Sequence, residues 1–496
     1  MPAPTPDQVS TGIAGLDYLL KGGLPAHELY LVTGDAGTGK TTLALQFLLA
    51  GAKAGERVLY FSLSQTAASL RKIALSHGWS LDGVELHELD SLGPDEQAAA
   101  EQTIFPSAEV ELNETAGKFF EVIEKSKPAR LVFDSMAQLR ALANGSLQFE
   151  RQLFAMRHRF ATMNCTVLLL DRVEEASSSV EDLCHGAVRL ERHAAEYGNT
   201  RRRLVIEKMR GMDAHGGYHN FKIRAGGLQV FPRLNMKDRS VDDAPGSLAS
   251  GVEALDALVG GGLESGSAVL LLGATGTGKT SLATLYIRAA AKRGERAVVY
   301  LFEERLDSFF KRAAGLGMDL KPFVEQKLVS VHQVNAGDLS PGEFSDLVRR
   351  AVQDEGAGIV LIDSVSGYFH SMPQEQMLVT QMHELLSFLS GCGVLTLLIA
   401  GQHGIAGQDI IGPLEVSYLC DTLLLLRHFD AGGEVRKALA VIKKRHGPHE
   451  NSVRELRFDK DGPRLGEPLK QFDGLLTGNP IFHGNVGSLL NRDTEK

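Results

Sequence analysis

The sequence predicts an α/β protein of two tandem domains, each a mostly parallel sheet covered by helices on both faces. Three observations predict this fold. The chain has 496 residues, too many for one ordinary core. A glycine-rich phosphate-loop pattern occurs twice, and short apolar runs alternate with longer helical patterns in both halves. We therefore expect a domain at residues 1–240, a second at 241–470 and a C-terminal tail at 471–496.

The two glycine-rich stretches both match the pattern G-x-x-x-x-G-K-[ST]. They are Gly34-Asp35-Ala36-Gly37-Thr38-Gly39-Lys40-Thr41 and Gly273-Ala274-Thr275-Gly276-Thr277-Gly278-Lys279-Thr280. Each follows an apolar run and precedes a segment with a helical pattern, residues 42–49 and 281–291. This strand–loop–helix order is the context that the motif requires.

A triphosphate explains this choice of residues. Glycines let backbone N–H groups and the helix N-terminus approach phosphate oxygens closely. The lysine places a charge near the β- and γ-phosphates, and the last threonine hydroxyl holds Mg²⁺. The residues expected to bind ATP are Gly34, Gly37, Thr38, Gly39, Lys40, Thr41 and Thr42 in the first loop and Gly273, Thr275, Gly276, Thr277, Gly278, Lys279, Thr280 and Ser281 in the second.

The two halves are copies of one domain. A shift of 239 residues, the separation of Gly34 and Gly273, also aligns Gly22-Gly23-Leu24 with Gly261-Gly262-Leu263. This period is far longer than that of a solenoid repeat, so it indicates a domain duplication. Charged and turn residues replace apolar periodicity at 237–247, where we expect the boundary.

Apolar runs predict the strands of each sheet. After the strands that precede the loops, residues 29–32 and 268–272, the expected strands are 57–62, 130–133 and 166–170 in the first copy and 297–302, 358–362 and 394–399 in the second. Helices such as 67–76 and 115–126 lie between them. Residues 203–231 and 437–465 are rich in strand patterns and are expected to add antiparallel edge strands, before a partly ordered segment at 466–496.

Composition narrows the functional class. The net charge of −9 argues against a protein built to coat nucleic acid, and Arg201-Arg202-Arg203 is expected to begin a strand. No apolar run is long enough to span a membrane, and the N-terminus lacks a secretion signal, so we expect a cytoplasmic protein. The four cysteines have no zinc spacing and are expected to be buried free thiols.

An aspartate follows a predicted strand in each copy. Asp134 ends Leu131-Val132-Phe133-Asp134, and Asp363 ends Val360-Leu361-Ile362-Asp363. A strand-end carboxylate commonly supports Mg²⁺ beside a phosphate loop, so the predicted metal-side residues are Thr41, Asp134, Thr280 and Asp363. The alternative is that each aspartate caps the next helix.

The two copies differ in the acid that would activate an attacking oxygen. Glu303 and Glu304 follow a strand in the second copy, at the sheet edge where the nucleotide is expected. The aligned residues of the first copy are Ser64 and Gln65, and neither is a base. The sequence therefore predicts slow turnover in the first copy and chemistry in the second. An alternative is that Glu174 or Glu175 replaces the missing acid.

Together, the tandem loops, the Glu303-Glu304 pair, the strand-end Asp-Ser pairs and Lys208-Met209-Arg210-Gly211 resemble the KaiC family of tandem RecA-like ATPases. The resemblance runs from about residue 10 to residue 472. It implies two RecA-like domains, a hexameric ring with ATP between neighbouring subunits, hydrolysis and, in the clock members, autophosphorylation with Kai partners.

The resemblance also assigns further residues. Lys208 and Arg210 match a basic element that a neighbouring subunit contributes to the first site, and Lys443 and Arg445 match it in the second. Cations delivered across an interface would stabilise the transferring phosphoryl group. Read alone, these residues fit ordinary exposed strand positions better than a role in the site, and the resemblance reverses that preference.

The family's phosphorylated Ser-Thr pair aligns with Ser417-Tyr418. The resemblance implies phosphorylation of Ser417, while Tyr418 in place of threonine argues against an ordered two-step cycle. The alternative is a serine that faces a subunit interface, and Thr422 is a weaker candidate. Gln402 follows a predicted strand and fits a sensor of the γ-phosphate and a loop amide with a local hydrogen bond equally.

These observations favour an ATP-binding ring protein that hydrolyses ATP mainly in its second domain, with serine/threonine autokinase activity on Ser417. ATP and Mg²⁺ are the expected cofactors. The expected partners are other copies of the chain and a Kai-type or signalling protein. The alternatives are a RecA-type DNA motor, which would place basic and aromatic residues on loops inside the ring, and a scaffold in which ATP only joins subunits.

Overall fold

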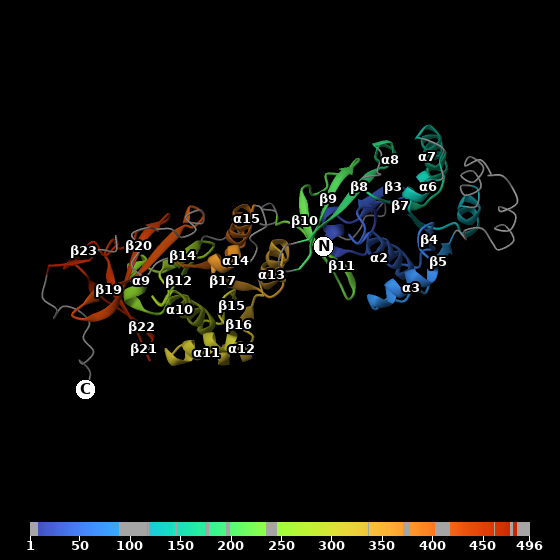
Figure 1. Ribbon diagram of the computed structural model, residues 1–496. Coiled ribbons are helices and arrows are strands. Elements are labelled where there is room, and N and C mark those ends of the chain that lie inside the picture. The colour runs from blue at the N-terminus through green and yellow to red at the C-terminus, as the bar shows by residue number, and fades with distance from the viewer. Residues whose placement is uncertain are drawn as a thin grey trace. The chain divides into compact units, whose positions relative to one another are not determined.

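The computed structural model describes residues 8–88, 117, 119–141, 143, 146–173, 178–194, 199–234, 246–335, 337–370, 377–401, 417–460, 462–476 and 480–483. The chain divides into two compact units, Met1–Arg233 and Leu234–Lys496 (Figure 1). The boundary predicted at residues 240 and 241 lies outside the described residues. Each unit is considered by itself below.

The described part of unit 1 contains a nine-stranded sheet in the order β11-β10-β9-β8-β3-β7-β6-β4-β5 (Figure 1). Its strands are β3 (Leu29–Gly34), β4 (Val58–Ser62), β5 (Val84–Glu88), β6 (Arg130–Asp134), β7 (Thr166–Asp171), β8 (Gly186–His193), β9 (Arg201–Met209), β10 (Tyr218–Arg224) and β11 (Gly227–Phe231). Strands β3 to β8 are parallel, and β9 to β11 extend the sheet antiparallel from β8.

The described part of unit 2 repeats this topology in the order β16-β15-β17-β18-β14-β19-β20-β21-β22. Its strands are β14 (Ala268–Gly273), β15 (Arg296–Leu301), β16 (Val329–Gln333), β17 (Ala357–Asp363), β18 (Leu395–Gly401), β19 (Thr422–Ala431), β20 (Glu434–Lys444), β21 (Arg454–Asp459) and β22 (Gly462–Pro468). Strands β14 to β19 are parallel, and β20 to β22 are antiparallel. The predicted fold class is confirmed in both units.

Helices cover both faces of each sheet, as predicted. In unit 1 they are α1 (Ala14–Leu19), α2 (Lys40–Lys53), α3 (Ala67–Ser76), α6 (Met136–Ala141), α7 (Ser146–Ala161) and α8 (Ser178–Leu183), and the described residues 119–126 are also helical. In unit 2 they are α9 (Glu253–Leu258), α10 (Lys279–Lys292), α11 (Leu306–Gly315), α12 (Lys321–Glu325), α13 (Pro341–Gln353), α14 (Val365–His370) and α15 (Leu378–Gly391).

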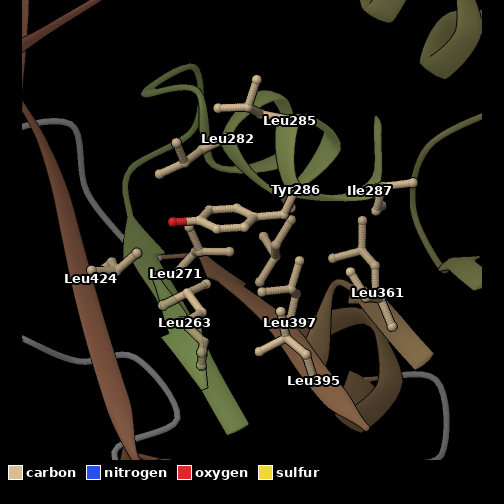
Figure 2. Close-up of a cluster of buried hydrophobic side chains, with 14 of the residues drawn as sticks. Leu263, Leu271, Leu282, Leu285, Tyr286, Ile287, Leu361, Leu395, Leu397 and Leu424 are labelled. Atoms are coloured by element: carbon tan, nitrogen blue, oxygen red, sulfur yellow. The ribbon is translucent and has the colours of Figure 1, made fainter. Parts of the chain in front are cut away.

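Each unit has two apolar layers, one on each face of its sheet. In unit 2, α9, α10 and α11 pack on one face, and α13, α14 and α15 pack on the other. Figure 2 shows the first layer, where the ring of Tyr286 on α10 lies among Leu271, Leu282 and Leu424. Strands buried on both faces must be apolar at nearly every position, which is why these runs were visible in the sequence.

Three short pairs complete the described structure: β1 (Gln8–Val9) with β2 (Leu24–Pro25), β12 (Ser247–Leu248) with β13 (Leu263–Glu264), and β23 (Phe472–Asp473) with β24 (Ile481–Phe482). Part of the predicted tail therefore folds, because Phe472 and Leu475 pack against Phe429 of β19. None of the helices in the described ranges has the length and apolar character needed to cross a bilayer.

The cysteines are free thiols, as expected. Cys165, Cys184 and Cys420 are buried, whereas Cys392 is partly exposed, so the prediction of burial is wrong for that residue. Arg201 begins β9, which agrees with the strand start predicted for the arginine run. The three arginines are partly exposed rather than fully exposed.

Candidate functional site

Both phosphate loops lie at the carboxyl ends of parallel strands. The first connects β3 to α2 and the second connects β14 to α10, and both strands are central in their sheets. The glycines take positive φ where the chain turns: 76° at Gly37, 111° at Gly39, 82° at Gly276 and 102° at Gly278. Backbone of this kind directs N–H groups toward one point beside a helix N-terminus, which is how phosphate is bound.

The loop lysines lie against their own loops. Lys279 Nζ donates hydrogen bonds to the carbonyl oxygens of Gly273 (2.7 Å) and Ala274 (2.8 Å), and Lys40 Nζ donates to those of Gly34 and Asp35. Burial lowers the pKa of both lysines, and nearby carboxylates oppose that shift. Each ammonium group is therefore held where the β- and γ-phosphates are expected.

The predicted metal-side groups of the second copy lie together. Thr280 Oγ1 donates a hydrogen bond to Asp363 Oδ2 at 2.7 Å, which joins the start of α10 to the end of β17. Burial raises the pKa of Asp363 to about 6, while the Thr280 hydrogen bond and the charges of Arg312 and Lys279 act to lower it. Two hard oxygen donors beside a phosphate loop fit Mg²⁺, which keeps several water or phosphate ligands.

The first copy brings the equivalent groups close, but each is bound by another side chain. The hydroxyl of Tyr60 donates to Asp134 Oδ2 at 2.6 Å. Gln65 Nε2 donates to Thr41 Oγ1 at 3.2 Å. Burial raises the pKa of Asp134, and the Tyr60 hydrogen bond lowers it. The second copy has Val299 and Glu304 at the positions of Tyr60 and Gln65.

The two acids that follow β15 have different surroundings. Glu304 Oε1 lies 2.6 Å from Arg312 Nη1 on α11. Glu303 is exposed, and its carboxylate reaches over Gly367 of α14. Burial lowers the pKa of Lys279, and the charges of Asp363 and Glu303 oppose this shift. In the first copy Ser64 and Gln65 follow β4, as expected, and the residue aligned with Arg312 is Ile73.

Each copy has one pair of basic residues, Lys208 with Arg210 or Lys443 with Arg445. Each pair lies at the opposite end of the parallel strands from the phosphate loop of the same copy. Lys443 pairs across the sheet with Leu423, which pairs with Leu270, three residues before Gly273. At about 3.3 Å per residue, the loop begins about 10 Å farther along the strands. Lys208 has the same register through Ala187 and Leu31. None of these basic residues reaches the phosphate loop of its own copy.

These basic side chains bind nearby carbonyl groups. Lys208 Nζ donates to Glu181 O (2.6 Å), and Arg210 Nη2 donates to Asp182 O (2.9 Å). In the second copy, Lys443 Nζ donates to Cys420 O (2.7 Å) and Ser417 O (3.3 Å). Arg445 pairs with Asp421 at 3.3 Å. The two copies therefore present equivalent basic elements at equivalent edges.

Ser417 lies at this same edge, just before Cys420 and the start of β19. It is partly exposed, and the neighbouring Tyr418 has 57% of its surface exposed. Thr422, the weaker candidate, is buried in β19 with 3% of its surface exposed. A hydroxyl that accepts phosphate at this position lies at the opposite end of the parallel strands from the second phosphate loop of the same chain.

Two further residues approach each loop and were not found from the sequence. Arg192 of β8 lies over Gly37, and at the equivalent position of β19 His428 Nε2 donates to the carbonyl oxygen of Thr275 at 3.3 Å. A side chain on Gly39 would collide with Ile223, and one on Gly278 would collide with Phe458. Their identities differ between the copies and they come from distant strands, so neither motif nor repeat indicates them.

Three candidates lie outside the described residues: Glu174, Glu175 and Gln402. The described residues also contain no group of three or more His, Cys, Asp or Glu side chains that would hold a metal. A metal at either loop would therefore depend on phosphate oxygens and water in addition to the threonine and aspartate.

Comparisons with known proteins agree with this arrangement. The family model for the KaiC ATPase matches residues 9–235 and 248–468. The circadian clock protein KaiC3 of a Synechocystis strain is 27% identical over 484 residues, covering 96% of this chain and 95% of that protein. The circadian clock oscillator proteins KaiC of Thermostichus vulcanus and Synechococcus elongatus are each 27% identical, covering 95% of this chain and 92% of those proteins.

Proposed function

The chain belongs to the KaiC ATPase family, and from that premise we propose that its second site hydrolyses ATP while its first site binds nucleotide with slow turnover. One observation supports this division. Glu303 lies with Lys279 and Asp363 at one edge of the second sheet, whereas Ser64 stands in its place in the first copy. A carboxylate accepts a proton from an attacking oxygen, and a serine hydroxyl at neutral pH does not.

The two acids have separate proposed roles. Glu303 is the general base, since it is exposed at the loop side and Glu304 is held in an ion pair by Arg312. The second loop and Lys279 bind the phosphates. Mg²⁺, held by Thr280 and Asp363, would neutralise charge on the phosphate oxygens. The expected result is transfer of the γ-phosphoryl group to water, with the proton passing to Glu303.

Assembly follows from the position of the basic elements. Lys443 and Arg445 lie at the sheet edge opposite the second loop, so they would complete the site of a neighbouring chain. Lys208 and Arg210 would do the same for the first site. This head-to-tail use of two different edges generates a ring when the rotation closes. We propose a homohexamer, as the resemblance to the KaiC family implies.

The same geometry supports Ser417 as the acceptor of a phosphoryl group. Ser417 hydrogen-bonds through its carbonyl to Lys443, so the residue accompanies the basic element into the neighbouring site. We propose that Ser417 accepts a phosphoryl group from ATP bound to the adjacent chain, in a single step because Tyr418 replaces the second acceptor. The protein would act in the cytoplasm as a nucleotide- or phosphorylation-dependent switch with a Kai-type or other signalling partner.

The test follows the γ-phosphate of labelled Mg-ATP in purified protein, separating free phosphate from label on protein. Glu303→Gln is expected to lower phosphate release at least about 100-fold. Ser64→Ala, the equivalent position of the first copy, is the matched control and is expected to leave the rate unchanged.

The loop lysines test the division of labour. Lys279→Ala is expected to abolish turnover, and Lys40→Ala is expected to impair ATP-dependent assembly, followed by light scattering after size-exclusion chromatography. The reverse pattern would contradict the proposal. Label on protein that is lost in Ser417→Ala supports autophosphorylation, whereas free phosphate alone leaves an ATPase whose serine is structural.

A further inference from the structure

The metal side of the first site differs from that of the second in a way that the missing acid does not explain. In the second copy, Thr280 and Asp363 hydrogen-bond to each other, and no other side chain separates them. In the first copy, both equivalent groups are bound by residues whose counterparts in the second copy, Val299 and Glu304, are of a different type. Tyr60 binds Asp134, and Gln65 binds Thr41.

Tyr60 is held firmly in this position. It lies in the middle of β4, none of its surface is exposed, and its hydroxyl lies 2.6 Å from Asp134 Oδ2. A hydroxyl bound to a carboxylate forms one of the stronger protein hydrogen bonds, and this one is shielded from water. A metal that recruits Oδ2 would leave a buried hydroxyl without its acceptor, which is unfavourable.

Gln65 acts on the other metal-side group. Its amide nitrogen donates to Thr41 Oγ1 at 3.2 Å. Ser62 Oγ accepts from the backbone N–H of Gln65 at 2.9 Å and donates to its carbonyl oxygen at 2.7 Å, which fixes the segment after β4. Gln65 therefore binds the metal-side hydroxyl of the first copy, while Tyr60 binds its metal-side carboxylate.

We propose that the first site binds its nucleotide with little dependence on Mg²⁺, because Tyr60 and Gln65 satisfy the two protein groups that would support the metal. Lys40 donates to carbonyl groups of its own loop instead, so the first loop is expected to keep its affinity for phosphate. The second site, with Val299 and Glu304 at these positions, keeps the ordinary dependence. This inference deepens the function proposed above and rests on nucleotide binding at both loops.

The experiment measures ADP affinity by titration calorimetry, with Mg²⁺ and with EDTA, in full-length protein. Lys279→Ala confines binding to the first site, and Lys40→Ala confines it to the second. Mg²⁺ is expected to raise ADP affinity less than about threefold at the first site and about tenfold or more at the second.

Tyr60→Phe in the Lys279→Ala background removes the hydroxyl and is expected to raise the Mg²⁺ response of the first site to about tenfold. The matched control is Tyr30→Phe, which removes another buried hydroxyl, one that bonds Pro25 O at 2.7 Å away from the site. It is expected to leave the Mg²⁺ response unchanged. If Tyr60→Phe does not fold, Gln65→Ala, at a partly exposed position, provides the same test.

Equal Mg²⁺ responses at the two sites, or a response that neither Tyr60→Phe nor Gln65→Ala alters, would overturn the inference. Loss of ADP binding from both single-site proteins, with or without Mg²⁺, would instead contradict the proposed nucleotide binding itself. The two failures are therefore distinguishable in one set of titrations.

Discussion

The carboxyl group of Asp363 lies where it could support a metal ion. Burial of its charged form lowers the stability of the folded protein. Burial raises its pKa from the ordinary 3.8 to about 6, so at pH 7 the folded protein holds a charge that the unfolded chain would solvate better. Asp363→Asn keeps an oxygen that can accept from Thr280 and removes this charge. We expect it to stabilise unit 2 by about 1–3 kcal/mol at pH 7 while abolishing turnover.

The sign of this effect depends on pH. Because the folded-state pKa is the higher one, the cost of Asp363 is present above about pH 6 and disappears as the pH falls toward 4, where the carboxyl is neutral in both states. Calorimetric unfolding at pH 7 and pH 4.5 should therefore show a stabilisation by Asp363→Asn that shrinks at the lower pH. A stabilisation that is constant with pH would show that the charge is not its source.

Arg312 is expected to position Glu304 rather than to contact nucleotide. Its guanidinium lies 2.6 Å from Glu304, and the first copy lacks both members of the pair, with Gln65 and Ile73 in their places. We expect Arg312→Gln to lower the kcat for ATP about tenfold and to leave KM unchanged. In a double-mutant cycle, Glu304→Gln should add little to Arg312→Gln. Additive losses would mean that the two residues act separately.

For single residues, the sequence predicted which side chains form the candidate sites but not all of their contacts. Thr280 and Asp363 were expected together, because a phosphate loop and a strand-end aspartate share one edge of a parallel sheet. The bond from Tyr60 to Asp134 was not foreseen, because a tyrosine inside an apolar strand resembles core packing. Arg192 and Phe458 were also missed, since long-range contacts of single residues leave no local pattern.

At the scale of elements, β6 begins with an arginine whose side chain is inside unit 1. Arg130 is 3% exposed, its Nε forms an ion pair with Glu56 at 2.5 Å, and its Nη1 donates to Ser10 O (2.6 Å) and Phe47 O (3.0 Å). The guanidinium thus connects the start of β6 to α2 and to the N-terminal segment. Its removal leaves a carboxylate and two carbonyl groups without their donor.

We expect Arg130→Ala to destabilise unit 1 by about 3–5 kcal/mol. Trp79 is the only tryptophan of the chain and packs in unit 1, so its fluorescence during urea unfolding reports this unit. The control is Lys21→Ala, which breaks an exposed pair with Asp213 in the same unit and is expected to cost less than about 1 kcal/mol. A small loss of stability in Arg130→Ala would mean that water replaces the hydrogen bonds of the guanidinium.

Elements with strong patterns were predicted well. The helix expected at 67–76 is α3, and the buried parallel strands begin and end within two residues of their predicted bounds. The strands β5, β8, β16 and β19 were not assigned from the sequence; of these, the outer strands β5 and β16 are partly exposed and lack a continuous apolar run. The order of the strands needed the structure, since it depends on long-range pairing.

At the scale of the whole molecule, the proposal that a site is shared by two chains predicts complementation. A chain with Lys279→Ala has no functional second loop, and one with Lys443→Ala has no functional basic element. Each variant alone is expected to be inactive. When the two are mixed and reassembled, some neighbours join an intact loop to an intact Lys443, so ATPase activity should recover to about a quarter of the wild-type value. A mixture that stays inactive would contradict sharing between chains.

Each basic element lies at the opposite end of the strands from the loop of its own chain. This position limits the number of complete sites in an assembly. If sites are shared between chains as proposed, the loops at one end of an open row and the basic elements at the other have no neighbour, so a row holds, of each of the two kinds of site, one complete site fewer than it has members. Closing the row into a circle supplies the missing site without any new residue. Turnover per chain should therefore rise with protein concentration and reach its maximum only when the circle closes.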